Sequence, residues 1–389
     1  MVVSQIPAKR IVLLGAGHAH VGVLRAFARD PQPGTQVTLI TQRQLTPYSG
    51  MLPGLIAGLY RHDDAHIDTL PLGAFAGANV IIAEATGLDL ARKQVLCADH
   101  PSVSYDILSI DIGSAPGIGA TPGAAQHAIP VKPIDGFLKR FDAARTRILA
   151  TERPMRIAVV GGGAGGVELM LAMQHRLKAD ARVEGQDPSR LSFALIEANA
   201  TILSGFPAAM RRRFTRLLQN RQIEVLTNTR VASLEPGVVV TDANQRIPFD
   251  DVFWTTEAAP AAWLADTGLA LTDKGFIRVT SALQSVSHAD VFAAGDVAMI
   301  DGHPTPRSGV YAVRAAKPLA ANIRNLVTGR PLIEFQPQRQ ALYLISIGER
   351  YAIGTRNGFT LGGKWVWHLK DWIDRRFMAR FKNLPARQS

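Results

Sequence analysis

Two glycine loops constrain the fold of this chain more than any other feature. The first contains Gly15 and Gly17 and follows an aliphatic run at residues 11–14, and the second, residues 161–166, follows a similar run at residues 155–160. A strand, a glycine turn and a helix N-terminus form the start of a βαβ unit. Glycine lets the backbone approach a pyrophosphate, and the helix N-terminus attracts its charge. The sequence therefore predicts an α/β protein with two Rossmann-like domains.

The two loops differ in how completely they match the G-x-G-x-x-G pattern. The second loop has all three glycines, whereas His20 stands in place of the third glycine of the first. The strand after the first loop leads into Gln42-Arg43 where an acid usually holds a ribose. Gln42 could bond a ribose and Arg43 could meet adenine or a phosphate, or both are plain surface residues. The strand after the second loop ends in Glu197, which is suited to the ribose of NAD rather than NADP, or is an ordinary strand-end acid.

Later segments indicate how the domains are connected. Residues 46–54 combine turn-forming residues with Tyr48 and Met51, and we interpret them as a loop packed over a flat ligand. Glycine and proline break the strand patterns at residues 111–116, and a proline does so again at 255–260. A short strand then ends in Gly295-Asp296, at the sheet edge where α/β proteins bind ligands.

The two breaks resemble the chain crossings between the domains of flavoproteins with two dinucleotide-binding domains. That resemblance implies that one domain is inserted in the other. The first domain is expected to comprise residues 1–120 and 280–335, and the inserted domain residues 121–279. A small C-terminal α+β segment, residues 336–389, completes the chain.

Composition excludes several classes of protein. The single cysteine, Cys97, excludes an intramolecular disulfide, a redox-active cysteine pair and a cysteine-rich metal site. No run of about 20 apolar residues is present, so no membrane-spanning helix is expected. The net charge of +11 is concentrated toward the C-terminus, without a nucleic-acid-binding motif. We expect a cytoplasmic protein that binds neither nucleic acid nor a structural metal.

Residues 364–382 form a basic amphipathic helix in this interpretation. Lys370, Asp371, Asp374, Arg375 and Lys382 are predicted to lie on its polar face. The opposite, apolar face is expected to contain Trp365, Val366, Leu369, Trp372, Ile373, Phe377 and Phe381. This pattern fits a helix in a membrane interface, which would place the protein at the cytoplasmic face of the membrane. A helix docked on its own domain or on a homodimer partner is the alternative.

Together these features resemble the flavoproteins with two dinucleotide-binding domains, which include the pyridine-nucleotide disulfide oxidoreductases. In that family the first domain binds FAD and the inserted domain binds NAD(P)H. The chain is most similar to the type II NADH dehydrogenases and to the flavoprotein module fused to some selenophosphate synthetases. That module shares the Gly-His-Ala-His start, the Pro-Tyr-Ser-Gly-Met-Leu-Pro loop and the Trp-Val-Trp tail. No synthetase domain is present here.

The resemblance implies which residues contact the two cofactors. Those expected at FAD are Gly15, Gly17, His18, Ala19, His20, Gln42, Arg43, Pro47, Ser49, Gly50, Met51, Ala85, Gly113, Gly295, Asp296, Tyr311 and Ala312. Those expected at NADH are Gly161, Gly163, Ala164, Gly166, Glu197, Glu257 and Ala258. Glu168 is expected near the nicotinamide and the flavin. Lys132 could stabilise negative charge on the reduced flavin or on a quinol, or is a surface or salt-bridging lysine.

The predicted function is transfer of a hydride from NADH to FAD and of two electrons to a quinone-type acceptor, without redox cysteines. One alternative is a soluble NAD(P)H-dependent flavin reductase whose protein or small-molecule acceptor belongs to selenium or sulfur metabolism. Another is a non-catalytic FAD-binding module.

Overall fold

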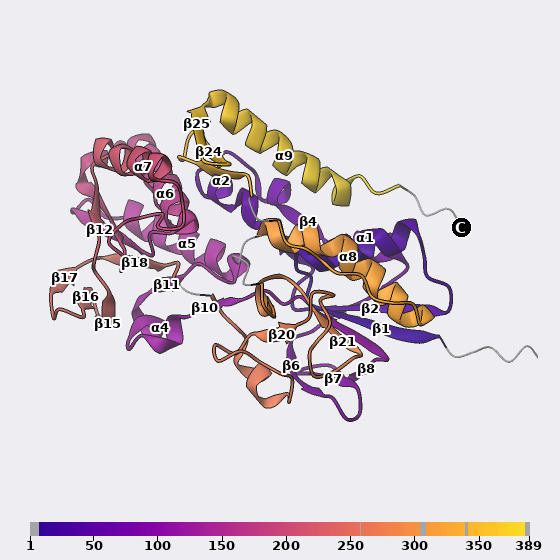
Figure 1. The fold of residues 1–389 in the computed structure, drawn as a ribbon. Helices are drawn as coiled ribbons and strands as arrows, with labels where there is room; N and C mark the ends of the chain where they lie inside the picture. The colour runs from indigo at the N-terminus through magenta and orange to yellow at the C-terminus, as the bar shows by residue number, and fades with distance from the viewer. Residues whose placement is uncertain (1–7, 257, 304–308, 339–340, 386–389) are drawn as a thin grey trace, which may run out of the picture.

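The computed structural model describes residues 8–256, 258–303, 309–338 and 341–385 (Figure 1). Its first domain is built on a parallel five-stranded sheet in the order β21-β9-β1-β2-β5. The strands are β1 (Lys9–Leu14), β2 (Thr35–Thr41), β5 (Asn79–Ile82), β9 (Ile107–Ile110) and β21 (Val291–Ala293). Three helices pack on this part: α1 (His18–Arg29), α3 (Thr69–Ala76) and α8 (Gly309–Thr328).

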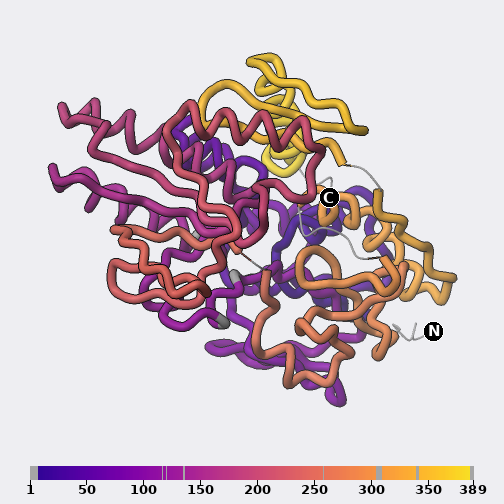
Figure 2. The backbone as a smooth tube through the Cα atoms, turned by 60° about the vertical axis from the view of Figure 1, so that its left-hand side comes forward, coloured from indigo at the N-terminus to yellow at the C-terminus, as the bar shows by residue number. Residues whose placement is uncertain are grey.

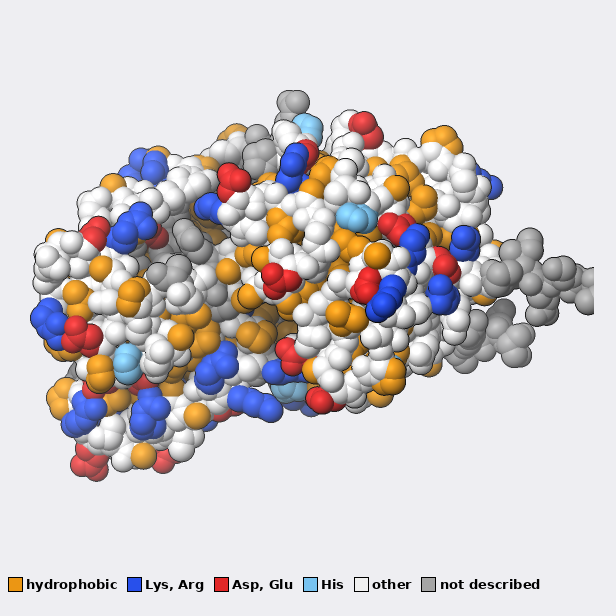
Figure 3. Space-filling model, turned by 90° about the horizontal axis from the view of Figure 1, so that it is seen from below, with side chains coloured by type: hydrophobic (Ala, Val, Ile, Leu, Met, Phe, Trp, Pro, Cys, Tyr) orange, Lys and Arg blue, Asp and Glu red, His pale blue; other side chains and the backbone are white. Residues whose placement is uncertain are grey.

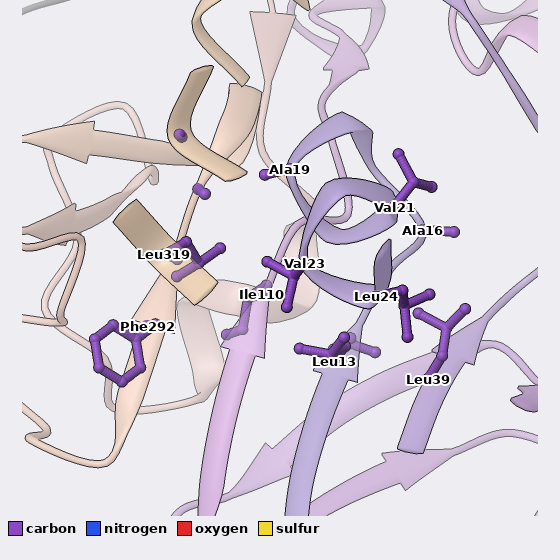
Figure 4. Close-up of a cluster of buried hydrophobic side chains, with 14 of the residues drawn as sticks. Leu13, Ala16, Ala19, Val21, Val23, Leu24, Leu39, Ile110, Phe292 and Leu319 are labelled. Carbon is purple, nitrogen blue, oxygen red and sulfur yellow. The ribbon is translucent and has the colours of Figure 1, made fainter. Parts of the chain in front are cut away.

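The core of the first domain forms because aliphatic residues of neighbouring strands face the apolar side of α1. Figure 4 shows Leu13, Leu39 and Ile110 on three strands beneath Val23 and Leu24 of α1. All five side chains are buried. Strands β1, β2, β9 and β21 are buried on both faces over most of their length, as expected for a parallel sheet, and this explains their aliphatic runs.

The second domain repeats this plan. Its parallel sheet has the order β11-β18-β12-β13-β14. The strands are β11 (Ile129–Pro130), β12 (Met155–Val160), β13 (Leu191–Ile196), β14 (Ile223–Leu226) and β18 (Asp251–Trp254). The main helices are α5 (Ile134–Leu149), α6 (Ala164–Val183) and α7 (Ala208–Asn220). The predicted α/β class with two Rossmann-like domains is confirmed.

The chain enters and leaves the second domain through two short strands that pair in antiparallel fashion. Strand β10 (Ala115–Pro116) pairs with β19 (Ala258–Ala259), so the outgoing and returning segments lie side by side. Leu264, Leu269 and Ile277 then pack into the core of the first domain. The predicted boundary at residue 279 is therefore too late, because the structure returns to the first domain directly after β19.

Smaller elements complete each domain. In the first, β3 (Leu45–Pro47) pairs with β4 (His66–Asp68), and a three-stranded sheet contains β6 (Ala85–Asp89), β7 (Gln94–Cys97) and β8 (Val103–Ser104). Strands β20 (Ile277–Val279) and β22 (Ala298–Ile300) pair in a two-stranded sheet, and the short helix η6 (Gly295–Val297) directly precedes β22. In the second, α4 (Ala124–His127) contacts a sheet of β15 (Val231–Glu235), β16 (Val238–Thr241) and β17 (Arg246–Pro248).

The C-terminal segment connects both domains. It consists of β23 (Tyr343–Ser346), β24 (Ala352–Arg356), β25 (Phe359–Gly363) and α9 (Lys364–Lys382). Ile345 and Ile353 pack into the second core, whereas Val366 and Phe377 of α9 pack into the first. Figure 2 shows this segment, in yellow, lying over the region where the two domains meet.

The structure corrects the predicted faces of α9. Lys370 and Asp374, which were expected on the polar outer face, are 8% and 4% exposed. Trp365 and Trp372, which were expected on the same face as Phe377, are each 56% exposed. The helix thus has one inner face that contains a buried charge pair and a separate outer aromatic face. No described helix is long and apolar enough to cross a membrane.

Candidate active site

The first glycine loop packs tightly against the end of strand β9. Gly15 has a φ of +90°, and a Cβ added there would overlap the backbone of Asp111. A Cβ at Gly17, which precedes the first residue of α1, would overlap the Asp111 carboxyl group. Glycine is therefore required at both positions by contacts within the protein, in addition to any approach to a cofactor.

The N-terminus of α1 is not left entirely free, contrary to the sequence interpretation. The backbone N–H groups of Ala19 and His20 donate to Asp111 Oδ2, at 2.8 and 3.1 Å. Two of the donors expected to face a pyrophosphate are thus already paired with an internal carboxylate. Asp111 was missed because the sequence showed only the break in the strand pattern that begins with it.

The His20 ring is bonded to the glycine loop and to strand β9 and does not face a ligand. Burial lowers the pKa of its fully buried ring to about 4. Because a carbonyl only accepts, Nδ1–H of the neutral ring donates to Gly15 O at 2.6 Å, and Nε2 accepts from Ser109 Oγ at 2.8 Å. The predicted contact of the His20 side chain with FAD is therefore corrected to a structural role.

His18, in contrast, offers an unpaired group at the site. Its Nε2 atom is buried and has no hydrogen-bond partner among the residues that the structure describes. Burial lowers the pKa of the His18 ring to about 4. The positive charge of Lys132 lowers it further, and the negative charge of Asp296 partly offsets both effects. A Cβ at Gly309, the first residue of α8, would lie 3.1 Å from Ser49 Oγ and 3.9 Å from His18 Cε1. Three segments predicted at the flavin thus meet here.

Lys132 and Asp296 form an ion pair between the two domains. Lys132 Nζ lies 2.7 Å from Asp296 Oδ2 and 2.9 Å from Ser114 Oγ, and Ser114 also donates to Asp296 at 3.2 Å. The side chains are 37% and 17% exposed. Lys132 is therefore a salt-bridging lysine, and its role toward the reduced flavin or a quinol stays a prediction. The pair lies close enough to His18 to influence the pKa of that ring.

The other residues predicted at FAD are more scattered. Gln42 and Arg43 are exposed beyond β2, and Pro47 pairs with His66 across β3 and β4. Met51 is 0% exposed and packs into the protein core, so its side chain is not free for a ligand. The remaining positions are Gly50 in the helix η1 (Ser49–Met51), half-buried Ala85 at the start of β6, Gly113 at φ +72°, Gly295 at φ +73°, Tyr311 and buried Ala312.

The second glycine loop leaves its helix end open. Gly161 has a φ of +114°, and a Cβ at Gly166 would overlap the Gly161 carbonyl oxygen. Gly163 precedes Ala164, the first residue of α6, and a Cβ at Gly163 or Gly165 would meet no atom within 4 Å. This open space at the positive end of a 20-residue helix suits a diphosphate. The open loop and the unpaired His18 nitrogen both fit the binding of dinucleotide cofactors.

Glu197 organises the second loop. Its Oε2 accepts from Gly162 N at 2.6 Å, and its Oε1 accepts from Asn199 N and Nδ2 at 2.7 and 2.6 Å. The buried carboxylate therefore holds the loop through contacts within the protein. Ala258 lies in β19, whereas Glu257 lies outside the described residues.

Glu168 is half-buried and belongs to a charge network that the sequence did not reveal. Ser346 of β23 donates to Glu168 Oε1 from its backbone N at 2.7 Å and from its Oγ at 2.8 Å. Burial raises the pKa of Glu168, and the opposing charge of Lys370 reduces that effect. Lys370 Nζ donates to Asp374 Oδ2 at 2.8 Å and to Gly50 O at 2.6 Å.

The network extends to the loop at residues 46–54. Burial opposes the charged form of Lys370, but the carboxylates of Asp374 and Glu168 outweigh this and raise its pKa. Burial and Asp374, which accepts a hydrogen bond from Tyr48, raise the pKa of the Tyr48 hydroxyl. The Tyr48 ring stacks on Phe377 of α9 at a centroid distance of 4.5 Å. Helix α9 therefore covers this loop on one side.

The helical spacing of α9 contained a signal for this network. Lys370 and Asp374 fall at intervals of four in the series that begins at Val366 and continues near Phe377 and Phe381. A cation and an acid one turn apart within an apolar stripe indicate a buried pair. Their partner Glu168 could not be identified in this way, because it lies on a helix of the other domain.

Comparison with known proteins identifies the family of this chain. A model of the pyridine nucleotide-disulphide oxidoreductases matches residues 9–316. The chain belongs to this family. The match confirms the predicted family and its two cofactors, FAD and NADH, and identifies the protein as an oxidoreductase.

Similar proteins include two curated reductases. The chain is 26% identical to the demethylphylloquinone reductase NdbB of Synechocystis over 91% of its own length and 86% of that protein. It is 22% identical to a type II NADH:quinone oxidoreductase of Staphylococcus epidermidis over 95% of its own length and 94% of that protein.

Solved structures share the fold. The NDH2 of Plasmodium falciparum in complex with NADH superimposes with a TM-score of 0.80 at 16% identity, covering 98% of this chain and 99% of that one. The sulfide:quinone oxidoreductase of Aquifex aeolicus gives a TM-score of 0.81 at 20% identity, covering 98% and 93%.

Proposed function

We propose that this protein is an NADH:quinone oxidoreductase that uses FAD. The observation that carries the proposal is the charge network where the NADH domain, the flavin loop and α9 meet. Buried Lys370 bonds buried Asp374 and the Gly50 carbonyl oxygen, and it interacts through its charge with half-buried Glu168. Reduction of a quinone requires protons as well as electrons, and this network contains a cation and two carboxyl groups of raised pKa. The names of the similar proteins support a quinone as the acceptor.

The protein residues have separate tasks in this proposal. When bound, FAD supplies the redox chemistry, accepting a hydride from NADH and releasing two electrons to the acceptor. The open N-terminus of α6 orients the NADH diphosphate, and Glu197 keeps the glycine loop in shape. Lys132 holds Asp296 beside the first domain's loops. The proposed FAD site is lined by glycines that either have a positive φ or leave no room for a Cβ: Gly15, Gly17, Gly113 and Gly295.

In this proposal Glu168 supplies a proton to the electron acceptor, and Lys370 supplies a positive charge beside it. Since both hydrogen bonds from Ser346 go to Oε1, the other carboxyl oxygen of Glu168 is the atom available to hold a proton. Lys370 remains an ammonium because its carboxylate neighbours raise its pKa. A fixed cation in a buried site stabilises negative charge that develops on an acceptor oxygen.

A cysteine-based acceptor reaction does not fit this chain. Cys97 is the only cysteine in the sequence and lies in β7, in the sheet of β6, β7 and β8. Burial raises the pKa of its thiol, which disfavours the reactive thiolate. This observation separates the protein from disulfide reductases of the same family.

We also propose that the outer face of α9 and strand β25 contacts the membrane surface that holds the quinone. Phe359 is 77% exposed, and Leu361, Trp365 and Trp372 are each 56% exposed. The Arg376 guanidinium lies 5.2 Å from the centroid of the Trp372 ring. Exposed aromatic groups beside cationic ones are typical of interfacial helices. The face away from α9, seen in Figure 3, has acidic and basic side chains interspersed.

Anaerobic reduction tests the proposed reaction. We expect NADH to bleach the flavin absorbance of the full-length protein and quinones to restore it. If the bound flavin stays oxidised under excess NADH, the enzyme proposal fails. If only water-soluble acceptors restore the absorbance, the protein is instead a soluble flavin reductase.

Vesicle sedimentation tests the membrane contact. Trp365→Ser with Trp372→Ser should abolish binding to vesicles of phosphatidylglycerol and phosphatidylcholine without changing reduction by NADH. Leu70→Ser, at an exposed residue of α3, is the control. Unchanged vesicle binding with a loss of dimers in sedimentation velocity would assign this face to a homodimer.

A further inference from the structure

Asp111 occupies an unusual position for an acid. It directly follows strand β9 and is 2% exposed. Oδ2 accepts the N–H groups of Ala19 and His20, and the backbone oxygen accepts from Gly17 N at 3.1 Å. One residue thus holds the first turn of α1 through three hydrogen bonds.

The surrounding glycines fit this carboxyl group. A Cβ at Gly17 would overlap the carboxyl group from one side, and a Cβ at Gly295 would overlap Oδ1 from another. Gly17 and Gly295 lie far apart in the sequence and are both assigned to the FAD site. The Asp111 side chain therefore fills the space between the two segments and sets their separation.

No described cation neutralises Asp111. Burial raises its pKa to about 7, although the N–H groups of His20 and Ala19 lower it, and the charge of Asp296 on η6 raises it further. Lys132, the nearest described cation to Asp296, is paired with that residue. His18 and His20 on α1 are both neutral at pH 7, because burial lowers their pKa to about 4.

We propose that Asp111 is the residue that positions the flavin loop, and that FAD binds most tightly when the Asp111 carboxyl group carries a proton. The inference rests on the placement of FAD at the Gly15 loop proposed above. The proton resides on Oδ1, which faces Gly295, because Oδ2 accepts two N–H groups. The neutral acid still holds the loop through Oδ2, but it no longer places a second anion at the end of the helix.

The physical reason is competition between anions. The FAD diphosphate is negatively charged, and the positive end of α1 stabilises one nearby anion better than two. Bound FAD therefore raises the pKa of Asp111 above its value in the free protein, and binding takes up a proton. By linkage, affinity is highest below pH 7 and falls as pH rises, by at most about tenfold per pH unit, until the pKa of the FAD complex is reached.

Calorimetry tests this with the unmodified chain. FAD is titrated into the FAD-depleted full-length protein at pH 7.5 in phosphate and in Tris, whose ionisation enthalpies differ. We expect uptake on the order of half a proton per FAD at pH 7.5 and close to none at pH 5.5. Stoichiometric binding without uptake at pH 7.5 overturns the Asp111 inference alone. No FAD binding at any pH overturns the proposed function as well.

A pair of variants assigns the proton to Asp111. Asp111→Asn keeps an oxygen for the two N–H groups and removes the charge, so FAD affinity should become independent of pH between 6 and 8 and exceed that of the wild type at pH 8. Asp106→Asn, at the other end of β9 and paired with exposed Arg10, should behave as the wild type. A wild-type pH dependence in Asp111→Asn contradicts the assignment, and if that variant does not fold, the calorimetry decides.

Discussion

The two glycine loops use a buried acid in opposite ways. In the first, Asp111 lies at the helix end itself and accepts two of the N–H groups of α1. In the second, Glu197 binds Gly162 from the side and leaves the N-terminus of α6 open. The incomplete motif is thus supported by an internal anion, whereas the complete motif needs no such support. An open helix end suits a substrate that enters and leaves, and a braced end suits a resident cofactor.

The helices that follow the two loops, α1 and α6, also differ in the role of their fifth residue. The fifth residue of α1 is Gly22, where a Cβ would overlap Ala316 of α8. The fifth residue of α6 is Glu168, which reaches the C-terminal sheet. The same position in two similar units therefore provides close helix packing in one domain and a proton-holding acid in the other.

The largest effect is expected at Gly166. Gly166→Ala places a Cβ against the Gly161 carbonyl oxygen and should lower the free energy of unfolding by about 3 kcal/mol. Gly165→Ala, in open space on the same helix, should raise it by about 0.5 kcal/mol. Thermal unfolding of both variants checks this. Equal stabilities would mean that the second loop is less tightly packed than described.

Lys370→Met should affect the acceptor side alone. Loss of the buried cation should slow quinone reduction about 100-fold, while flavin reduction by NADH changes little. Stopped-flow measurement of the two half-reactions separates these steps. Lys364→Met, at the exposed start of the same helix, is the matched control. An equal loss in both half-reactions would show that Lys370 supports the fold and not the acceptor.

The pH dependence of quinone reduction should report on Glu168. Because its pKa is raised, the protonated form persists to higher pH than for an ordinary glutamate, and the rate should fall as pH rises through that pKa. Ser346→Ala removes a hydrogen bond to the charged carboxylate and should move this fall to higher pH. Glu168→Gln should abolish it. A pH profile that Glu168→Gln leaves unchanged would assign the titration to another group.

The smallest effect is expected at Glu197. Glu197→Gln weakens the bond to Gly162 N–H and should raise the KM for NADH about tenfold without changing the FAD content. Steady-state kinetics with flavin quantification checks this. Glu224→Gln, at an exposed acid of β14, should change neither quantity. A loss of FAD in Glu197→Gln would contradict the division of the two loops between the cofactors.

Resemblance to a known family implied the domain insertion, and helical spacing predicted the C-terminal helix. The sequence by itself determined both βαβ units. These depend on local requirements of the backbone: positive φ at Gly15 and Gly161, and aliphatic runs for strands buried on both faces. Such requirements act over a few residues, so they can be read directly from short stretches of sequence.

Only the tertiary structure decided which polar groups meet. Glu168 and Ser346 are 178 residues apart, and Asp111 lies 91 residues from His20. Whether Lys370 faces water or Glu168, and whether His20 faces a ligand or Ser109, depends on which surfaces pack together after these distant segments are brought into contact. The reason is that a buried charge is stable only beside its partners, and those partners belong to other elements of the fold.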